Sequence, residues 1–84
     1  MTPQEAARLT GIFRTLFNDP GLELRDDLTA RDVDGWDSLN HVNLMILIED
    51  EFGVRFTTAE VSGLQDVGEL KRLLASKASA RRAA

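Results

Sequence analysis

Residues 38–53 constrain the fold of this chain more narrowly than any other stretch. Their apolar side chains recur with helical spacing and fall on two neighbouring strips, a core strip of Leu44, Met45, Ile48 and Phe52 and a second strip of Leu39, Val42 and Ile46. A helix that is buried on one side needs only one such strip. We therefore expect a helix from about Asp37 to Phe52 that is either unusually buried or leaves its second strip, beside Ser38, exposed for a partner.

The segment before it predicts a first helix and a long loop. Thr2 and Glu5 have the spacing of a capping box, in which each side chain satisfies the backbone amide of the other residue. The turn residues 18–21 then end this helix. Residues 20–37 form a connection rich in Asp, Gly and Thr, with apolar residues spaced through it that suggest an ordered loop laid over the core. A loop of this length in a small domain is often functional.

The C-terminal half predicts a short third helix near residues 58–62 and a longer fourth one from Asp66. Thr57 and Glu60 repeat the capping-box spacing before the short helix. Because no alternating β-branched run occurs, we predict an all-α fold. It is a four-helix bundle with three longer helices, one short third helix and a long loop between helices 1 and 2. We expect one domain over residues 1–78 and a flexible C-terminal tail over residues 79–84.

Composition excludes several classes of function. A chain of 84 residues buries only about 60–65 % of its unfolded surface, which leaves little room for a deep catalytic pocket. The absence of Cys excludes disulfides and thiolate metal sites, and a single His argues against an ordinary zinc site. The longest apolar run, Leu44–Ile48, is far shorter than the roughly 20 residues of a membrane span. Because the N-terminus also lacks the pattern of a signal peptide, we expect a cytoplasmic protein without a membrane partner.

Charge is distributed unevenly along the chain. The net charge is −4, yet residues 19–51 hold ten acids against only Arg25 and Arg31. An acidic middle repels phosphate backbones, so no nucleic-acid partner is expected. It would instead attract basic protein surfaces, although acids also simply keep a small domain in solution.

One motif carries the candidate chemistry, Asp34-Gly35-Trp36-Asp37-Ser38-Leu39. Its simplest interpretation is a helix cap, for which Asp37 or Ser38 could serve. The alternative is a modification site, since the free amides and dipole of a helix N-terminus favour a phosphate-linked group on the Ser38 hydroxyl. His41 lies close enough in sequence to approach Ser38, but no oxyanion hole is evident, so Ser-His-Asp catalysis is not expected.

Other features of this region have simple interpretations. Trp36 is expected to pack on the loop, with a position beside an attached group as the alternative. His41 is expected to pack or point to solvent beside the third helix, with a switch role as the alternative. Asp32 and Asp34 have the spacing of a calcium loop, but Asp37 stands where that loop needs Gly and Asn43 stands where it needs a bidentate Glu. No metal site is therefore predicted.

The motif and the helix after it resemble the acyl carrier protein family, the phosphopantetheine-binding carrier proteins. The resemblance covers about residues 4–78 and rests on the segment Gly35-Trp36-Asp37-Ser38-Leu39, on the helix end Ile48-Glu49-Asp50-Glu51-Phe52-Gly53 and on the four-helix layout. It implies that Ser38 receives covalent 4′-phosphopantetheine from coenzyme A through a separate phosphopantetheinyl transferase with Mg²⁺. The thiol of that arm would hold an acyl group as a thioester, and the chain itself would not be an enzyme.

The resemblance also implies how partners bind. Asp37 would support the attachment as a helix cap or as a contact of the transferase or its metal. The partner-binding residues would be Leu39, Val42, Ile46, Glu49 and Asp50. Partners would be an acyl- or aminoacyl-loading ligase and synthase or transferase enzymes, and the carrier would be a monomer. A sequestered chain would enter between the helices, where we expect Ile12, Phe13, Leu44, Met45, Ile48 and Leu70 to meet.

Two residues depart from the pattern of the family. Carriers of type II fatty-acid systems usually have acids at the second and fifth positions after the serine, and here those residues are Asn40 and Asn43. Neutral Asn weakens electrostatic steering but keeps hydrogen bonding. This favours a specialised discrete carrier of a fatty-acid, polyketide or related pathway. The alternatives are an aminoacyl or peptidyl carrier with the same arm, and an interaction bundle without enzyme activity in which Ser38 is only a helix cap.

Overall fold

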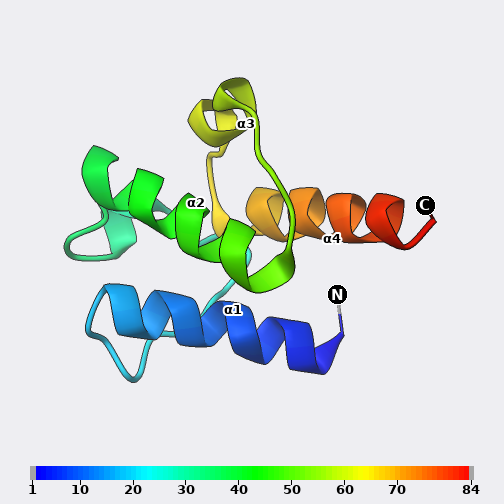
Figure 1. The fold of residues 1–84 in the computed structure, drawn as a ribbon. Helices are drawn as coiled ribbons and strands as arrows, with labels where there is room; N and C mark the ends of the chain where they lie inside the picture. The colour runs from blue at the N-terminus through cyan, green and yellow to red at the C-terminus, as the bar shows by residue number, and fades with distance from the viewer. Residues whose placement is uncertain (1, 84) are drawn as a thin grey trace.

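The computed structural model describes the backbone of residues 2–83 and the side chains of residues 2–77. It contains four α-helices and one short 3-10 turn, namely α1 (Pro3–Leu16), η1 (Ala30–Asp32), α2 (Ser38–Phe52), α3 (Thr58–Gly63) and α4 (Val67–Ala83). Residues 2–83 include no strand, so the prediction of an all-α fold with a short third helix is confirmed. In Figure 1, α1 and α2 run in opposite directions, and α3 stands apart above them.

Both predicted capping boxes are present. The Thr2 hydroxyl accepts from the amide of Glu5 at 3.1 Å, and the Glu5 carboxylate accepts from the amide of Thr2 at 2.8 Å. Thr57 and Glu60 make the same reciprocal pair at 3.1 and 2.8 Å. Each box satisfies two amides that have no partner within the helix, which fixes where α1 and α3 begin.

The other helix ends also follow local side-chain chemistry. α2 ends at Gly53, whose φ of 64° lies in the left-handed region that glycine adopts without strain. The Asp66 carboxylate accepts from the amide of Glu69 at 2.9 Å, so Asp66 caps α4 and the helix starts one residue later. α4 runs to Ala83, past the expected domain end at residue 78. The side chains beyond residue 77 and the whole of residue 84 lie outside the described residues, so the flexible tail over 79–84 stays a prediction.

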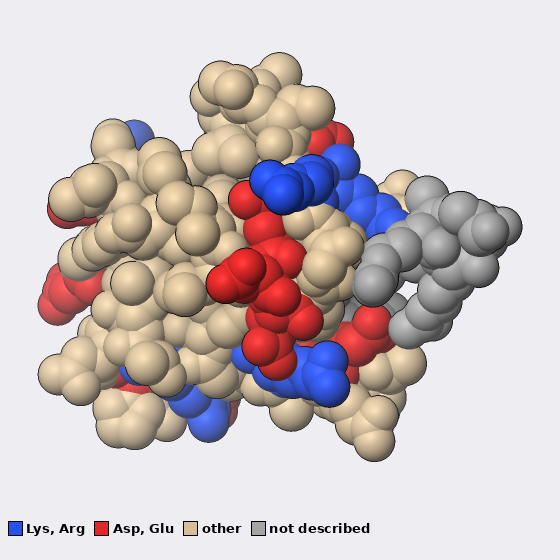
Figure 2. Space-filling model, in the orientation of Figure 1, with Lys and Arg blue, Asp and Glu red and all other residues tan. Residues whose placement is uncertain are grey.

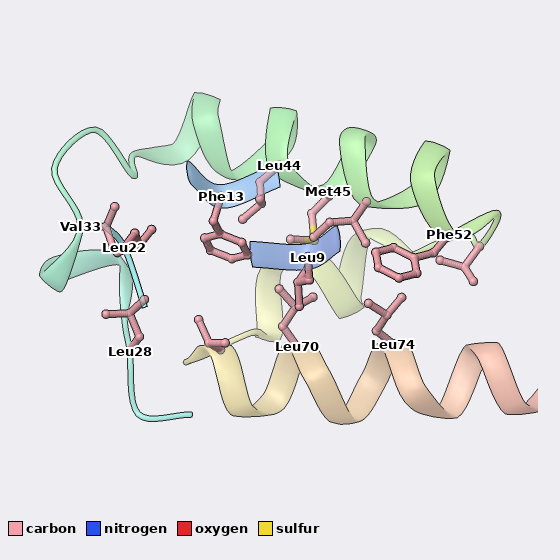
Figure 3. Close-up of a cluster of buried hydrophobic side chains, with 13 residues drawn as sticks. Leu9, Phe13, Leu22, Leu28, Val33, Leu44, Met45, Phe52, Leu70 and Leu74 are labelled. Atoms are coloured by element: carbon pink, nitrogen blue, oxygen red, sulfur yellow. The ribbon is translucent and has the colours of Figure 1, made fainter. Parts of the chain in front are cut away.

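The core is built from α1, α2, α4 and the long loop. Figure 3 shows thirteen buried apolar side chains that meet between these elements, namely Leu9, Phe13, Leu22, Leu28, Val33, Leu44, Met45, Ile48, Phe52, Val54, Val67, Leu70 and Leu74. The whole core strip of α2 is among them. Its second strip faces solvent, with Leu39 71 %, Val42 49 % and Ile46 54 % exposed. Of the two expectations for α2, the exposed strip is therefore confirmed.

The long loop is ordered, as its apolar anchors suggested, and it closes the start of α4. The carbonyl oxygens of Asp26 and Leu28 accept from the amides of Gly68 and Val67 at 2.8 and 2.9 Å. Lys71 of α4 donates to the carbonyl oxygen of Leu24 at 2.7 Å. The loop thus satisfies amides at the N-terminus of α4 that no helical carbonyl can reach.

This close approach predicts that a side chain at Gly68 is destabilising. A Cβ at Gly68 would lie 3.0 Å from the carbonyl oxygen of Asp26 and 3.3 Å from the Asp66 carboxylate. We expect Gly68→Ala to lower the free energy of unfolding by about 1–3 kcal/mol, because backbone must move to make room. The measurement is the midpoint of urea unfolding.

Gly11 of α1 supplies the matched control, since a Cβ added there would meet nothing within 4 Å. Gly11→Ala should raise the free energy of unfolding by up to about 1 kcal/mol through helix propensity alone. If the two substitutions shift the midpoint in the same direction, the close contact at Gly68 is not what limits the side chain there.

Candidate functional site

The start of α2 separates the capping residue from the candidate attachment residue. Asp37 has an extended backbone, and its carboxylate accepts from the amide of Asn40 at 2.8 Å, so Asp37 is the helix cap. Ser38 is the first residue of the helix and is exposed. Among the residues that the structure describes, none forms a hydrogen bond with its hydroxyl. The interpretation of Ser38 as only a cap is therefore wrong, because Asp37 caps the helix.

This arrangement suits a phosphate-linked group on Ser38. The hydroxyl is free and belongs to the N-terminal turn of a helix of 15 residues. The first amides of a helix have no carbonyl partner within it, and the helix dipole places partial positive charge there. A phosphodiester at Ser38 would have its charge favoured by both.

Asn40 has a structural task that the sequence did not reveal. Its amide group donates to the carbonyl oxygen of Gly35 at 2.7 Å and so ties the loop to α2. Gly35 has a φ of 88°, a conformation that glycine adopts without strain. The Asn43 amide in turn donates to the Asn40 oxygen at 3.3 Å. A carboxylate has no N–H to donate, so an acid at position 40 could not make the contact with Gly35.

Trp36 packs inward, as expected. Its ring lies edge-on to Phe13 at a centroid distance of 5.4 Å and tilted against Phe17 at 5.7 Å. Its indole nitrogen donates to Nδ1 of His41 at 3.0 Å. The other ring nitrogen of His41, Nε2, lies 2.9 Å from the carbonyl oxygen of Val61 in α3. His41 therefore packs beside the third helix, which was one of the placements expected for it.

A cavity of about 520 Å³ opens beside Ser38, between the first half of α2, α3 and the segment before α4. Its apolar wall is formed by Val42, Met45, Val61, Leu64 and Leu70. Polar side chains that line it are Asp37, Ser38, His41, Ser62, Gln65 and Asp66. The lining of the cavity is therefore partly apolar and partly polar.

Five of the six residues expected to meet between the helices, Phe13, Leu44, Met45, Ile48 and Leu70, share the buried core, and Ile12 packs against it, so that part of the prediction is confirmed. Only Met45 and Leu70 also line the cavity, and the entry point of a cargo chain stays a prediction. Phe13, Leu44 and Ile48 are fully buried in the core that joins α1 to α2, so close packing fills that interface. The space lies instead between α2 and α3.

The predicted partner-binding residues lie along the exposed side of α2. Leu39, Val42 and Ile46 form the apolar part, and Leu47, which the sequence reasoning missed, adds to it with 42 % exposure. Three of its four neighbours one helical turn away, Asn43, Asp50 and Glu51, are polar, and this pattern is the signal that could have marked Leu47 as outward-facing.

The acidic end of α2 is partly engaged within the chain. Figure 2 shows Asp and Glu atoms gathered over the C-terminal end of α2, with Lys and Arg atoms on either side. The Glu49 carboxylate accepts from the amide of Phe56 at 2.8 Å, and Glu51 lies 3.6 Å from Arg8. Asp50 is exposed. The partner-binding roles of Glu49 and Asp50 stay predictions.

The calcium-like spacing at Asp32 has another explanation. The Asp32 carboxylate accepts from the amide and the hydroxyl of Thr29 at 2.9 and 3.2 Å. These hydrogen bonds lower the pKa of Asp32 below its ordinary value, and the bond from the Thr29 amide has the largest effect. No group of three or more His, Asp or Glu side chains that could hold a metal ion occurs in the described part of the chain. Within the same part, no helix combines the length and the apolar character of a membrane span.

Comparisons with known proteins agree on one family. Residues 7–74 match the family model described as "Phosphopantetheine attachment site". Among solved structures, the chain is similar to a holo acyl carrier protein from Geobacter metallireducens, determined in solution by NMR. The two share 35 % sequence identity and a TM-score of 0.84, over 92 % of this chain and 88 % of the other. No curated protein matches the chain.

The cofactor of this family fits the site. 4′-Phosphopantetheine is attached covalently and supplies a thiol that holds an acyl group, so members carry intermediates and do not catalyse their conversion. The exposed Ser38 hydroxyl at the start of α2 is free to form the phosphate ester. With a family model over most of the chain and a similar fold at 35 % identity, this chain belongs to the acyl carrier proteins, a family of phosphopantetheine-binding carriers.

Proposed function

We propose that Ser38 bears the 4′-phosphopantetheine arm and that the chain presents an acyl intermediate on it to partner enzymes. The observation that carries this proposal is the free, exposed hydroxyl of Ser38 beside a cavity, with helix capping left to Asp37. Because the chain contains no Cys, the thiol of the arm is the only thiol of the loaded protein. An acyl thioester therefore has no internal thiol to which it could transfer.

The chain does not supply the base that would activate Ser38. His41 is the only His, and both of its ring nitrogens are engaged, one with Trp36 and one with Val61. A general base must lie within hydrogen-bond reach of the proton it removes and have a free lone pair to take it. We therefore assign activation of Ser38 to a separate phosphopantetheinyl transferase.

The cargo proposed is an acyl group of a fatty-acid, polyketide or related pathway. The apolar wall beside Ser38 supports this, as does the likeness to a holo acyl carrier protein. An aminoacyl or peptidyl cargo is the second candidate, because Ser62, Gln65 and Asp66 also line the same cavity. Mass spectrometry of the arm after incubation of the holo protein with acyl-loading and with aminoacyl-loading ligases would decide between the two.

Partner enzymes are proposed to dock on the exposed side of α2. Its apolar part is formed by Leu39, Val42 and Ile46, with Glu49 and Asp50 toward the acidic end. These partners are the transferase, a loading ligase and synthase or transferase enzymes. Because Asn40 is committed to Gly35 and carries no charge, the surface near Ser38 suits partners that depend little on electrostatic steering. A specialised discrete carrier, distinct from the general fatty-acid one, has this property.

We further propose that the carrier works as a monomer in the cytoplasm. A carrier needs the thiol of its arm reduced, and the cytoplasm maintains thiols in that state. The acidic surface at the end of α2 supports the proposal that neither nucleic acid nor an anionic membrane surface is a partner.

The attachment site is tested by incubating the apo protein with coenzyme A and a promiscuous phosphopantetheinyl transferase. We expect the wild type to gain the mass of one phosphopantetheine group and Ser38→Ala to gain nothing. Ser62→Ala is the matched control, since Ser62 lines the same cavity and should leave the gain intact. A wild type that gains no mass overturns the carrier function, and a gain that persists in Ser38→Ala overturns the site.

We propose that Asp37 supports attachment through its role as a cap, and two substitutions test this. Asn caps a helix as well as Asp does, so Asp37→Asn should keep both stability and the rate of modification at Ser38. Asp37→Ala removes the cap and should cost about 1 kcal/mol of unfolding free energy and slow the modification. If Asp37→Asn is modified as slowly as Asp37→Ala, the charge itself contacts the transferase or its metal.

The neutral surface near Ser38 gives a prediction about partner choice. Asn43→Asp adds a negative charge and disturbs only the 3.3 Å contact with Asn40. We expect it to speed association with fatty-acid synthase enzymes that have basic docking patches by roughly threefold at low salt, and little at high salt. Asn43→Gln is the neutral control. Wild-type association rates already equal to those of the general fatty-acid carrier would contradict a specialised role.

A further inference from the structure

The ring of His41 is fixed from two sides in one tautomer. An indole N–H can only donate, so the 3.0 Å contact with Trp36 makes Nδ1 of His41 the acceptor. The proton of the neutral ring then lies on Nε2, which donates to the carbonyl oxygen of Val61 at 2.9 Å. The two rings are also stacked, with an interplanar angle of 24°. Position, orientation and tautomer of His41 all follow from these contacts.

The helix that His41 holds, α3, attaches through Val61, which packs against the edge of the core, and through polar contacts. None of the side chains of α3 is fully buried. An ion pair joins Glu60 of α3 to Lys77 of α4 at 2.9 Å. Neither side chain lines the cavity. The amide of Thr57 and then Lys77 lower the pKa of Glu60, so this carboxylate stays charged at neutral pH. On the side of α3 that faces the cavity, the polar attachment is the hydrogen bond from His41 to Val61.

That contact lies at the cavity beside the attachment residue. His41 is three residues after Ser38, so it lies about one turn along the same face of α2. Val61 and Ser62 of α3 form the opposite wall. The chain of contacts from Trp36 through His41 to Val61 therefore sets how far that wall stands from the start of α2.

We propose that His41 is a latch that positions α3 over the cavity beside Ser38, and that breaking its contacts frees this wall to move outward. His41 is then a positioning residue and takes no part in chemistry. The latch concerns the apo chain, so it can fail while the carrier function holds. Only its use, which is to set the space open to a cargo, depends on the proposed function.

The latch requires the neutral ring. Protonation would place an N–H on Nδ1 directly facing the N–H of Trp36, and two donors repel each other. The charged groups around this site are the carboxylates of Asp37 and Asp66, which line the cavity, and the ion pair of Lys77 with Glu60, the residue before Val61.

Hydrogen exchange of the full apo chain, followed by NMR, tests the latch. His41→Phe keeps an aromatic ring beside Trp36 but removes both hydrogen bonds. We expect exchange of α3 amides to become about tenfold faster, the effect of one lost hydrogen bond, and the indole N–H resonance of Trp36 to shift. Amides of α1 and α4 should exchange at the rate of the wild type. Unchanged exchange in α3 would overturn the proposal.

Lys77→Met is the matched control, because it removes the ion pair that ties α3 to α4. It should speed hydrogen exchange in α3 but leave the indole resonance of Trp36 unchanged. If any loosening of α3 shifted that resonance, the two effects would appear together in this variant as well. If His41→Phe does not fold, the wild type alone can test the latch. The ¹⁵N chemical shifts of its His41 imidazole must then show that Nδ1 carries no proton. A proton on Nδ1 at neutral pH would overturn the latch.

Discussion

The apolar faces of α1, α2 and α4 occupy nearly all of the interior that 84 residues can build. Thirteen side chains from these helices, the long loop and the segment after α2 close-pack there, and none comes from α3. A short chain has few apolar residues to bury, so a fourth helix can only attach at the edge. The cavity, the exposed strip of α2 and the polar tethers of α3 all follow from that limit.

At the candidate site, the main result is a division of tasks between neighbouring residues. Asp37 satisfies the amide of Asn40, and Asn40 satisfies the carbonyl of Gly35, so the turn before α2 is held without Ser38. A serine that capped the helix would have its hydroxyl oriented by the backbone. Because the cap lies one residue earlier, the hydroxyl is exposed and unconstrained at a position where the helix dipole favours phosphate.

Local chemistry explains what could be predicted from the sequence. Capping boxes, the glycine after α2 and the core strip depend on residues within a turn or two of each other, and their spacing can be read directly. Contacts between residues that are distant in the sequence could not be predicted in this way. The amide of Gly68 meets the carbonyl of Asp26, and His41 meets the carbonyl of Val61 twenty residues away. Both acceptors are backbone groups, which every residue possesses, so no side-chain pattern marks them. The position of the cavity could not be predicted for the same reason, since it depends on how α3 is attached.

Trp36 has one consequence of a different kind. The chain contains a single Trp and no Tyr, so its intrinsic fluorescence comes from one indole at one place in the structure. That place adjoins Ser38, stacks on His41 and forms part of the cavity wall. The intrinsic fluorescence of the unlabelled protein is therefore a local optical signal from the loading site. Attachment of the arm, arrival of a cargo and docking of a partner can each be followed in real time by the emission of one native residue.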